Sequence, residues 1–180
     1  MTLPSRDPSL RELFELFNDP QPIEPPQFGY VSADELPPAF RRLLAHENHM
    51  TLALEEFHGR PVKLHVLSVA NRGDEYARMI LLSLDGTERI VEFGIVLLDF
   101  GLLTRDVRAE IVAGTTPLGR ILIEHDVLRR ISPTHFLKIT PNAALMNWFG
   151  LTTPEPVYGR LATIMCDGVP AIDLLEIVRL

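Results

Sequence analysis

Three ionisable side chains stand in rows of residues that are otherwise apolar. If residues 170–179 form a strand, Glu176 shares one face with aliphatic side chains, and in the segment 76–84 Arg78 does the same. Glu92 is the third such residue. An ionised side chain in an apolar row is costly unless it has a partner or faces a cavity. Arg78 and Glu176 are therefore candidates for a ligand site.

Arginine and glutamate each have a property that a ligand site can use. Arginine binds a carboxylate at two points, and a buried glutamate can keep its proton near neutral pH because desolvation raises its pKa. For Arg78 and Glu176, two structural explanations are as open as a role in ligand binding. The residues could form a structural salt bridge, or their strands could bury the opposite face. For Glu92 these structural explanations are favoured, since nothing else in the sequence singles it out.

Other chemistries lack their usual residues in this sequence. His46 and His49 are three positions apart, not four as in the zinc-protease helix, so a helix end or a pocket rim is favoured over a metal site. Cys166 lies in an apolar stretch and is predicted to be a core residue. No G-x-S-x-G, P-loop or G-x-G-x-x-G pattern occurs, so acyl-hydrolase, nucleotide and dinucleotide chemistries have no anchor.

The elements that must position these side chains follow from the apolar periodicity. Helical spacing and capping residues predict helices over 9–18, from Pro38, from Thr51 to Gly59, from Thr104 to Gly114, from Thr116, and from Thr140 to Gly150. Alternation predicts strands over 61–69, 76–84, 89–100, 128–139, 158–166 and 170–179. Consecutive hairpins with inserted helices favour an α+β fold, an antiparallel sheet of about six strands with helices packed on it.

Length and composition limit the class of protein. The 180 residues fit a single domain over 1–180, in which 1–37 form an N-terminal helix and a proline-rich strap. The net charge of −7 argues against nucleic acid as a partner. Charged residues interrupt any signal peptide, and no apolar stretch reaches the ~18 residues of a membrane span. We therefore expect a cytoplasmic protein without a membrane partner, as a monomer or homodimer.

Several segments, in the same order, resemble chorismate lyases (4-hydroxybenzoate synthases). The most specific is Gly114–Leu122, which is similar to their helix-opening segment with its proline-leucine-glycine-arginine run. The other similar segments are His49-Met50-Thr51 with Leu54-Glu55, Tyr76-Ala77-Arg78, Tyr158-Gly159-Arg160, and Gly168 through Glu176. The first of these resembles the first pocket helix of that family, and the second resembles its substrate-arginine strand. The last two together resemble its final hairpin. The resemblance covers roughly residues 40–180.

The resemblance implies a reaction and a set of site residues. In that family chorismate is converted to 4-hydroxybenzoate and pyruvate, in ubiquinone-type or other aromatic metabolism, by a carbon–oxygen lyase without a metal or cofactor. By motif position the substrate contacts fall on Met50, Arg78, Leu118 and Glu176. Arg78 and Glu176 would be catalytic, the first pairing with the ring carboxylate and the second assisting proton movement. Met50 and Leu118 would belong to helical flaps that shape and dry an internal pocket.

Two other functions stay open. The same fold serves as the ligand-sensing domain of certain winged-helix repressors, so the first is a non-catalytic domain that binds aryl or other carboxylic acids. Against a repressor, residues 1–45 are too short, too proline-rich and too acidic for a DNA-binding module. The second is a lyase or isomerase acting on a related carboxylated ring.

Overall fold

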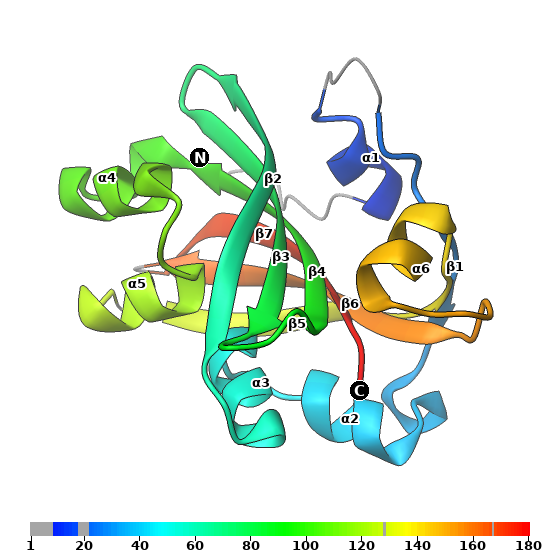
Figure 1. The fold of residues 1–180 in the computed structure, drawn as a ribbon. Coiled ribbons are helices and arrows are strands. Elements are labelled where there is room, and N and C mark those ends of the chain that lie inside the picture. The colour runs from blue at the N-terminus through cyan, green and yellow to red at the C-terminus, as the bar shows by residue number, and fades with distance from the viewer. Residues whose placement is uncertain (1–8, 18–21, 128, 167) are drawn as a thin grey trace.

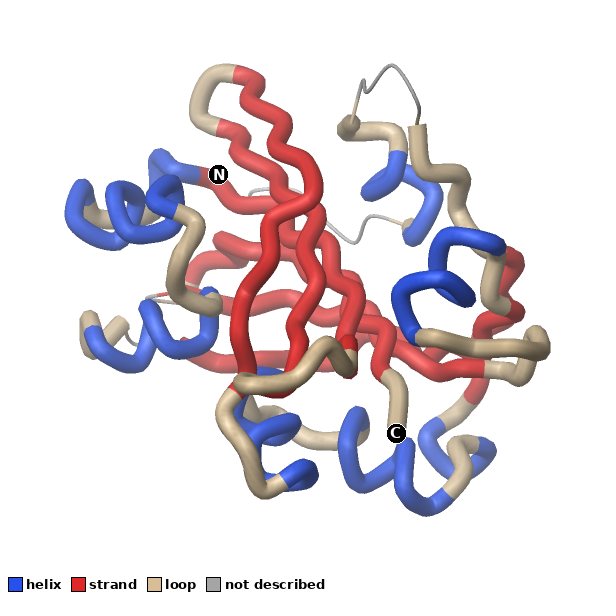
Figure 2. The backbone as a smooth tube through the Cα atoms, viewed as in Figure 1, coloured by secondary structure: helices blue, strands red, loops and turns tan. Residues whose placement is uncertain are grey.

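Seven antiparallel strands form one sheet at the centre of the molecule (Figures 1 and 2). The computed structural model describes residues 9–17, 22–127, 129–166 and 168–180. The strands are β1 (Gln27–Val31), β2 (Val62–Arg72), β3 (Glu75–Leu84), β4 (Ile90–Asp99), β5 (Arg129–Thr140), β6 (Val157–Cys166) and β7 (Val169–Val178). Their order across the sheet is β1-β5-β6-β7-β4-β3-β2, so the strand that comes last in the sequence lies in the middle.

Helices surround this sheet on both faces (Figure 2). The described α-helices are α1 (Leu10–Phe14), α2 (Pro38–Leu44), α3 (Met50–His58), α4 (Arg105–Ala113), α5 (Leu118–Glu124) and α6 (Ala143–Phe149). Two short 3₁₀ turns, Ala33–Glu35 and Phe100–Leu102, complete the described elements. The predicted α+β class with an antiparallel sheet is confirmed. None of the described helices has the length and apolar character needed to cross a bilayer.

The strand count differs from the prediction by one. The segment Gln27–Val31, which was assigned to the proline-rich strap, is a strand that pairs with β5, with Phe28 opposite Ile139. The last proline of this segment is Pro26, so the backbone N–H groups after it are free to join a sheet edge. The other six strands lie within two or three residues of the predicted ranges.

Three predicted helix starts are wrong by one or two residues. Thr51 lies inside α3, which begins after His49. Pro117 occupies the position before α5 and not its first turn. Asn142, instead of Thr140, caps α6 by accepting a hydrogen bond from the Leu145 N–H at 3.0 Å. Thr104 caps α4 as predicted, and left-handed glycines end α3, α4 and α6 at the predicted positions.

The first helix is shorter than the predicted span of 9–18. It covers Leu10–Phe14 and is held by a reciprocal capping box between Ser9 and Glu12. Residue 18 lies outside the described residues.

The two faces of the sheet bury different helices. On one face Phe93, Ile95 and Leu175 pack against α1 and α6. On the other face α4 and α5 pack over one end of the sheet, where Cys166 is a core residue as predicted. The helices α2 and α3 pack over the other end of the same face. The strip of β3, β4 and β7 between these two helix pairs carries both Arg78 and Glu176.

Gly159 of β6 tests how tightly the central strands are packed. A Cβ at this position would lie 2.5 Å from the Glu176 carbonyl oxygen, which is part of the neighbouring backbone and cannot move aside. We expect Gly159→Ala to lower the free energy of unfolding by about 1–3 kcal/mol, measured by urea denaturation. Gly29→Ala in β1 is the matched control, because a Cβ there meets nothing within 4 Å. Equal effects of the two substitutions would contradict this account of the packing.

Candidate functional site

A pocket lies on the face of the sheet that carries α2 to α5, between the two helix pairs. Its empty space is about 480 Å³, including the part that opens to solvent. Its floor is formed by β3, β4 and β7, and its roof by the starts of α3 and α5. The floor residues include Arg78, Ile80, Leu82, Glu92, Gly94, Val96, Leu174 and Glu176, and the roof residues are His49, Met50, Thr51, Pro117, Leu118 and Gly119.

The four predicted site residues meet in this pocket. Met50 and Leu118 line its roof, while Arg78 and Glu176 line its floor. All four side chains are buried. The pocket therefore brings together two floor residues that are almost a hundred positions apart in the chain.

Gly94 provides the open space in the floor. It stands directly between Ile80 of β3 and Glu176 of β7 in one row across the sheet. A Cβ at this position would approach Ile80 Cδ1 at 3.2 Å and Glu92 Oε1 at 3.3 Å. Any larger side chain would therefore fill the hollow between these residues.

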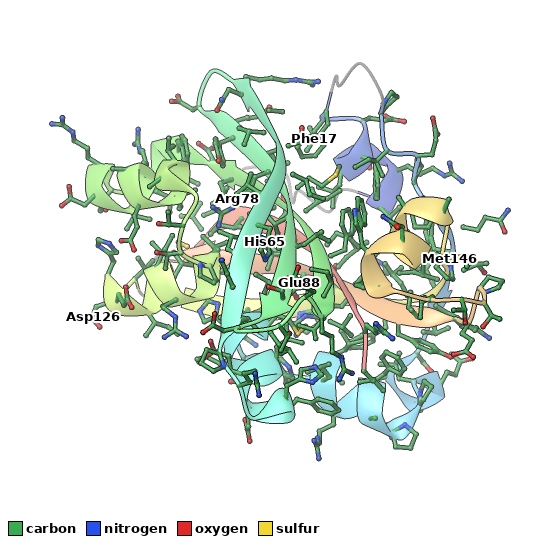
Figure 3. The ribbon with its side chains drawn as sticks, viewed as in Figure 1. Phe17, His65, Arg78, Glu88, Asp126 and Met146 are labelled. Carbon is green, nitrogen blue, oxygen red and sulfur yellow. The ribbon has the colours of Figure 1, made fainter. Side chains whose placement is uncertain are left out.

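Arg78 brings a buried cation to one end of the pocket. Figure 3 shows it on β3, and its side chain is 1% exposed. Its Nη1 donates a hydrogen bond to the Ile111 carbonyl at the end of α4 at 3.0 Å, while its Nε has no partner among the described residues. Burial lowers the pKa of this guanidinium from its ordinary value, and the Tyr76 hydroxyl opposes that shift. A guanidinium stays protonated, so this end of the pocket attracts an anion.

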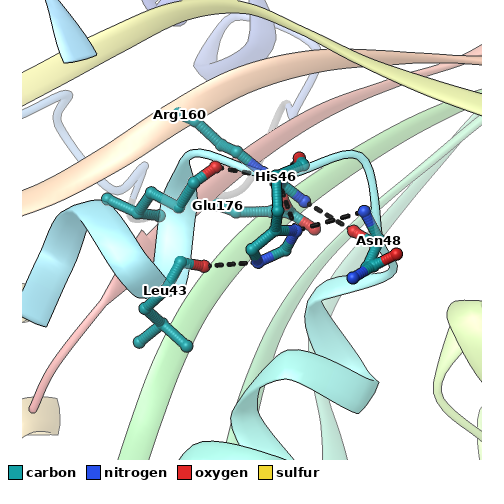
Figure 4. Close-up of polar contacts among 6 residues, drawn as sticks. Leu43, His46, Asn48, Arg160 and Glu176 are labelled. Carbon is teal, nitrogen blue, oxygen red and sulfur yellow. Dashed lines mark hydrogen bonds and ion pairs between the residues drawn. The ribbon is translucent and has the colours of Figure 1, made fainter.

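Glu176 is held by a second buried arginine, Arg160 of β6 (Figure 4). The Arg160 Nε donates to Glu176 Oε2 at 2.6 Å, and the Arg160 side chain is fully buried. Its Nη1 donates to the carbonyls of Leu44 and His46 at 3.0 and 2.8 Å, and its Nη2 to that of Asn48 at 3.2 Å. One guanidinium therefore ties the pocket glutamate to the loop 45–49, which leads into α3.

Arg160 is the residue to which the sequence analysis gave no role. The predicted strand 158–166 places Arg160 on one face with Ala162 and Ile164, which is the same pattern that singled out Arg78. The rule that a charge in an apolar row indicates a site therefore applies to Arg160 as well. What no pattern could supply is the register that sets Arg160 directly opposite Glu176.

The histidines lie at the pocket rim and a helix start, as favoured in the sequence analysis. His49 precedes the first residue of α3 and lines the pocket. The His46 Nε2–H donates a hydrogen bond to the Leu43 carbonyl at 2.7 Å, within the loop before α3. Burial, and after it the charge of Arg160, lower the pKa of His46. His46 is therefore a neutral ring near pH 7.

Glu92 lies beside this arrangement without a cation of its own. Its side chain is 4% exposed, it lines the pocket, and its Oε2 has no hydrogen-bond partner among the described residues. Burial raises the pKa of Glu92 well above 4.5, and the neighbouring Glu176 adds to the shift, while Arg160 opposes it. Among the described residues Glu92 forms no salt bridge, and the strand places its carboxyl beside another carboxylate in the cavity.

The two roof helices fit closely because Gly119 has no side chain. A Cβ at Gly119 would stand 2.9 Å from the Cβ of His49 and 3.1 Å from Thr51 Oγ1. An ion pair between Arg120 and Glu55, 2.7 Å apart, joins the same two helices further along. The starts of α3 and α5 therefore form one continuous cover over the pocket.

The Arg160–Glu176 pair should carry much of the stability of this region. We expect Arg160→Gln to lower the free energy of unfolding by about 3–5 kcal/mol, because it leaves a buried carboxylate and several carbonyls without their donor. The control is Arg120→Gln, which breaks an ion pair whose arginine side chain is 41% exposed and should cost only about 0–1 kcal/mol. Urea denaturation measures both. A similar small loss for the two variants would contradict the assigned role of Arg160.

The raised pKa of Glu92 predicts a stability that depends on pH. Below about pH 4.5 Glu92 is protonated in both the folded and the unfolded state. Above that pH the Glu92 of the unfolded chain ionises first, because its pKa is the lower of the two. The folded state therefore loses stability as the pH rises towards the raised pKa of Glu92. Glu92→Gln removes this loss. Its melting temperature should therefore exceed that of the parent protein at pH 8 by more than at pH 4.5. Exposed Glu88→Gln is the control, and an equal difference at both pH values would refute the prediction.

Comparisons with known proteins support the fold. No family model matches the chain, and no protein with a curated description matches it. PhnF from Mycobacterium smegmatis superposes with a TM-score of 0.57 at 14% identity, over 74% of this chain and 64% of that one. The effector domain of PhnF gives a TM-score of 0.53 at 13% identity, over 73% of this chain and 88% of the domain. This chain thus spans less than two thirds of the longer PhnF chain.

A third similar structure is the ligand-binding domain of a provisionally assigned GntR-family transcriptional regulator from Bordetella bronchiseptica. It superposes with a TM-score of 0.50 at 13% identity, over 67% of this chain and 86% of that domain.

The predicted lyase activity, with Arg78 and Glu176 as catalytic groups, is wrong. The similar structures are effector and ligand-binding domains. The chain shares the α+β fold of these effector and ligand-binding domains.

Proposed function

We propose that this chain is a small-molecule-binding domain whose ligand carries a carboxylate, bound at Arg78. The observation that carries the proposal is the Arg78 guanidinium, which is buried in the pocket wall with an unused Nε–H. Burying a cation away from water costs free energy, and an anion that enters the cavity and pairs with Arg78 would offset that cost. The similar effector and ligand-binding domains support this function for the fold.

The rest of the pocket suits a compact apolar body between polar ends. Met50 and Leu118 cover it from the roof, and Ile80, Val96 and Leu174 surround Arg78 and Gly94 on the floor. Such walls favour a ring or a short aliphatic chain, and each buried methylene contributes about 0.8 kcal/mol to binding. In this proposal Met50 and Leu118 contact the apolar part of the ligand and exclude water from the pocket. Arg78 orients the ligand by binding its carboxylate, and Glu176 lies at the opposite end of the ligand.

Binding of a simple aryl acid tests the function directly. We expect 4-methylbenzoate to bind the parent protein in isothermal titration calorimetry, and Arg78→Met to weaken that binding about 10- to 100-fold, since a charge-assisted hydrogen bond is worth about 1.5–3 kcal/mol. Arg105→Met, on the exposed face of α4, should leave the affinity unchanged. The neutral 4-methylbenzamide should bind weakly to all three proteins.

Two outcomes would count against this function. If Arg78→Met keeps the parent affinity while remaining folded by circular dichroism, the anion site lies elsewhere. If the amide binds the parent protein as well as the acid does, the pocket does not select a carboxylate.

A further inference from the structure

The end of the pocket opposite Arg78 holds more acid than base. Glu92 and Glu176 approach it from neighbouring strands, and the basic side chain in contact with Glu176 is Arg160. The remaining titratable group of the lining is His49, at the start of α3. A cavity wall with two carboxyls and one guanidinium lacks one positive charge whenever both acids are ionised.

Arg160 has little capacity left to balance Glu92. A guanidinium has five N–H donors, and four of them already serve Glu176 and the carbonyls of Leu44, His46 and Asn48. Glu92 Oε2 is buried and has no partner among the described residues. A proton can neutralise Glu92 in the empty pocket, but a cation on the ligand would serve the same purpose.

The geometry directs Glu92 towards the same hollow as Glu176. Its Oε1 lies 3.3 Å from the point where a Cβ of Gly94 would stand, and Gly94 is the residue directly opposite Glu176. The carboxyl of Glu92 therefore folds along β4 into the space that Gly94 leaves open. A group of the size of an ammonium ion in that space would contact Glu92 with Glu176 close by.

We propose that the Glu92 end of the pocket binds a protonated amine, so that the ligand is a small amino-carboxylic acid with its two charges at opposite ends. The carboxylate end rests on the function proposed above for Arg78. Glu92 and Val96, the partner of Arg78, are four positions apart on β4, which corresponds to about 13 Å between their backbone positions. Two long side chains that reach inward from these positions leave room for a spacer the size of one ring.

Three probes with the same ring and carboxylate separate the contributions of the two ends. They are 4-(aminomethyl)benzoate, which carries an ammonium group, 4-(hydroxymethyl)benzoate, which carries a neutral polar group of similar size, and 4-methylbenzoate. In calorimetry at pH 7 we expect the amine to bind at least tenfold more tightly than the other two. Its apparent enthalpy should change with the ionisation enthalpy of the buffer, because the proton on Glu92 is released when the amine binds.

The pH dependence of binding has a definite sign. The amine must displace the proton of Glu92, so its affinity should rise as the pH increases from 4.5 towards the raised pKa of Glu92, while that of 4-methylbenzoate should stay nearly constant. The groups that face Glu92 are Glu176 and Arg160 on one side, Arg78 along the floor, and His49 in the roof. His49→Asn serves as a check that the rise does not come from the histidine, and it should keep the same pH profile.

Glu92→Gln is the decisive variant, because it keeps the size of the side chain and removes only its ability to ionise. We expect it to lose the preference for the amine and the proton release. Equal binding of the amine and the hydroxymethyl compound by the parent protein would overturn the inference, as would a preference for the amine that survives in Glu92→Gln. In either case Arg78-dependent binding of 4-methylbenzoate would leave the proposed function standing. If none of the three acids binds, the proposed function fails and this inference fails with it.

Discussion

The structure depends most on the buried ion pair between Arg160 and Glu176. Two charges withdrawn from water cost several kcal/mol each, and this pair is tolerated because Arg160 also satisfies three backbone carbonyls of the chain before α3. The same contacts determine where the loop 45–49 lies and therefore where α3 begins. Two contacts thus determine the position of Met50 over the pocket. One is the bonding of Arg160 on β6 to the loop before α3, and the other is the close fit of α5 at Gly119.

The pocket exists because the two helix pairs on this face leave a strip of sheet between them. A row of ordinary β-sheet side chains would fill such a strip, as the apolar residues do on the opposite face. Here a glycine takes the central place, and three ionisable side chains stand around it. Their environments differ, since Glu176 has a guanidinium, Arg78 has a backbone carbonyl, and Glu92 has neither. These differences make the two ends of the cavity chemically distinct.

Sequence reasoning succeeded where a local rule was sufficient. Apolar alternation predicted six strands near their observed positions, and a charge in an apolar row located Arg78 and Glu176. It failed where the answer depended on pairing between distant segments. The edge strand β1 has five residues and finds its partner more than a hundred positions later, and the pairing of Arg160 with Glu176 depends on the β6–β7 register. The resemblance to chorismate lyases predicted the fold correctly and the activity wrongly, because a fold positions side chains but does not determine what chemistry they perform.

The strand order has a consequence for how this chain acquires its structure. The three strands β2, β3 and β4 form one half of the sheet, and β1, β5 and β6 form the other, while β7 pairs with β4 on one side and with β6 on the other. The two halves are therefore joined through β7, which the ribosome produces after the other six described strands. During synthesis each half can collapse locally, but both leave an edge of unpaired backbone groups exposed until β7 inserts between them. Cooperative folding of the domain, and with it the protection of those edges from aggregation, must wait for the final strand.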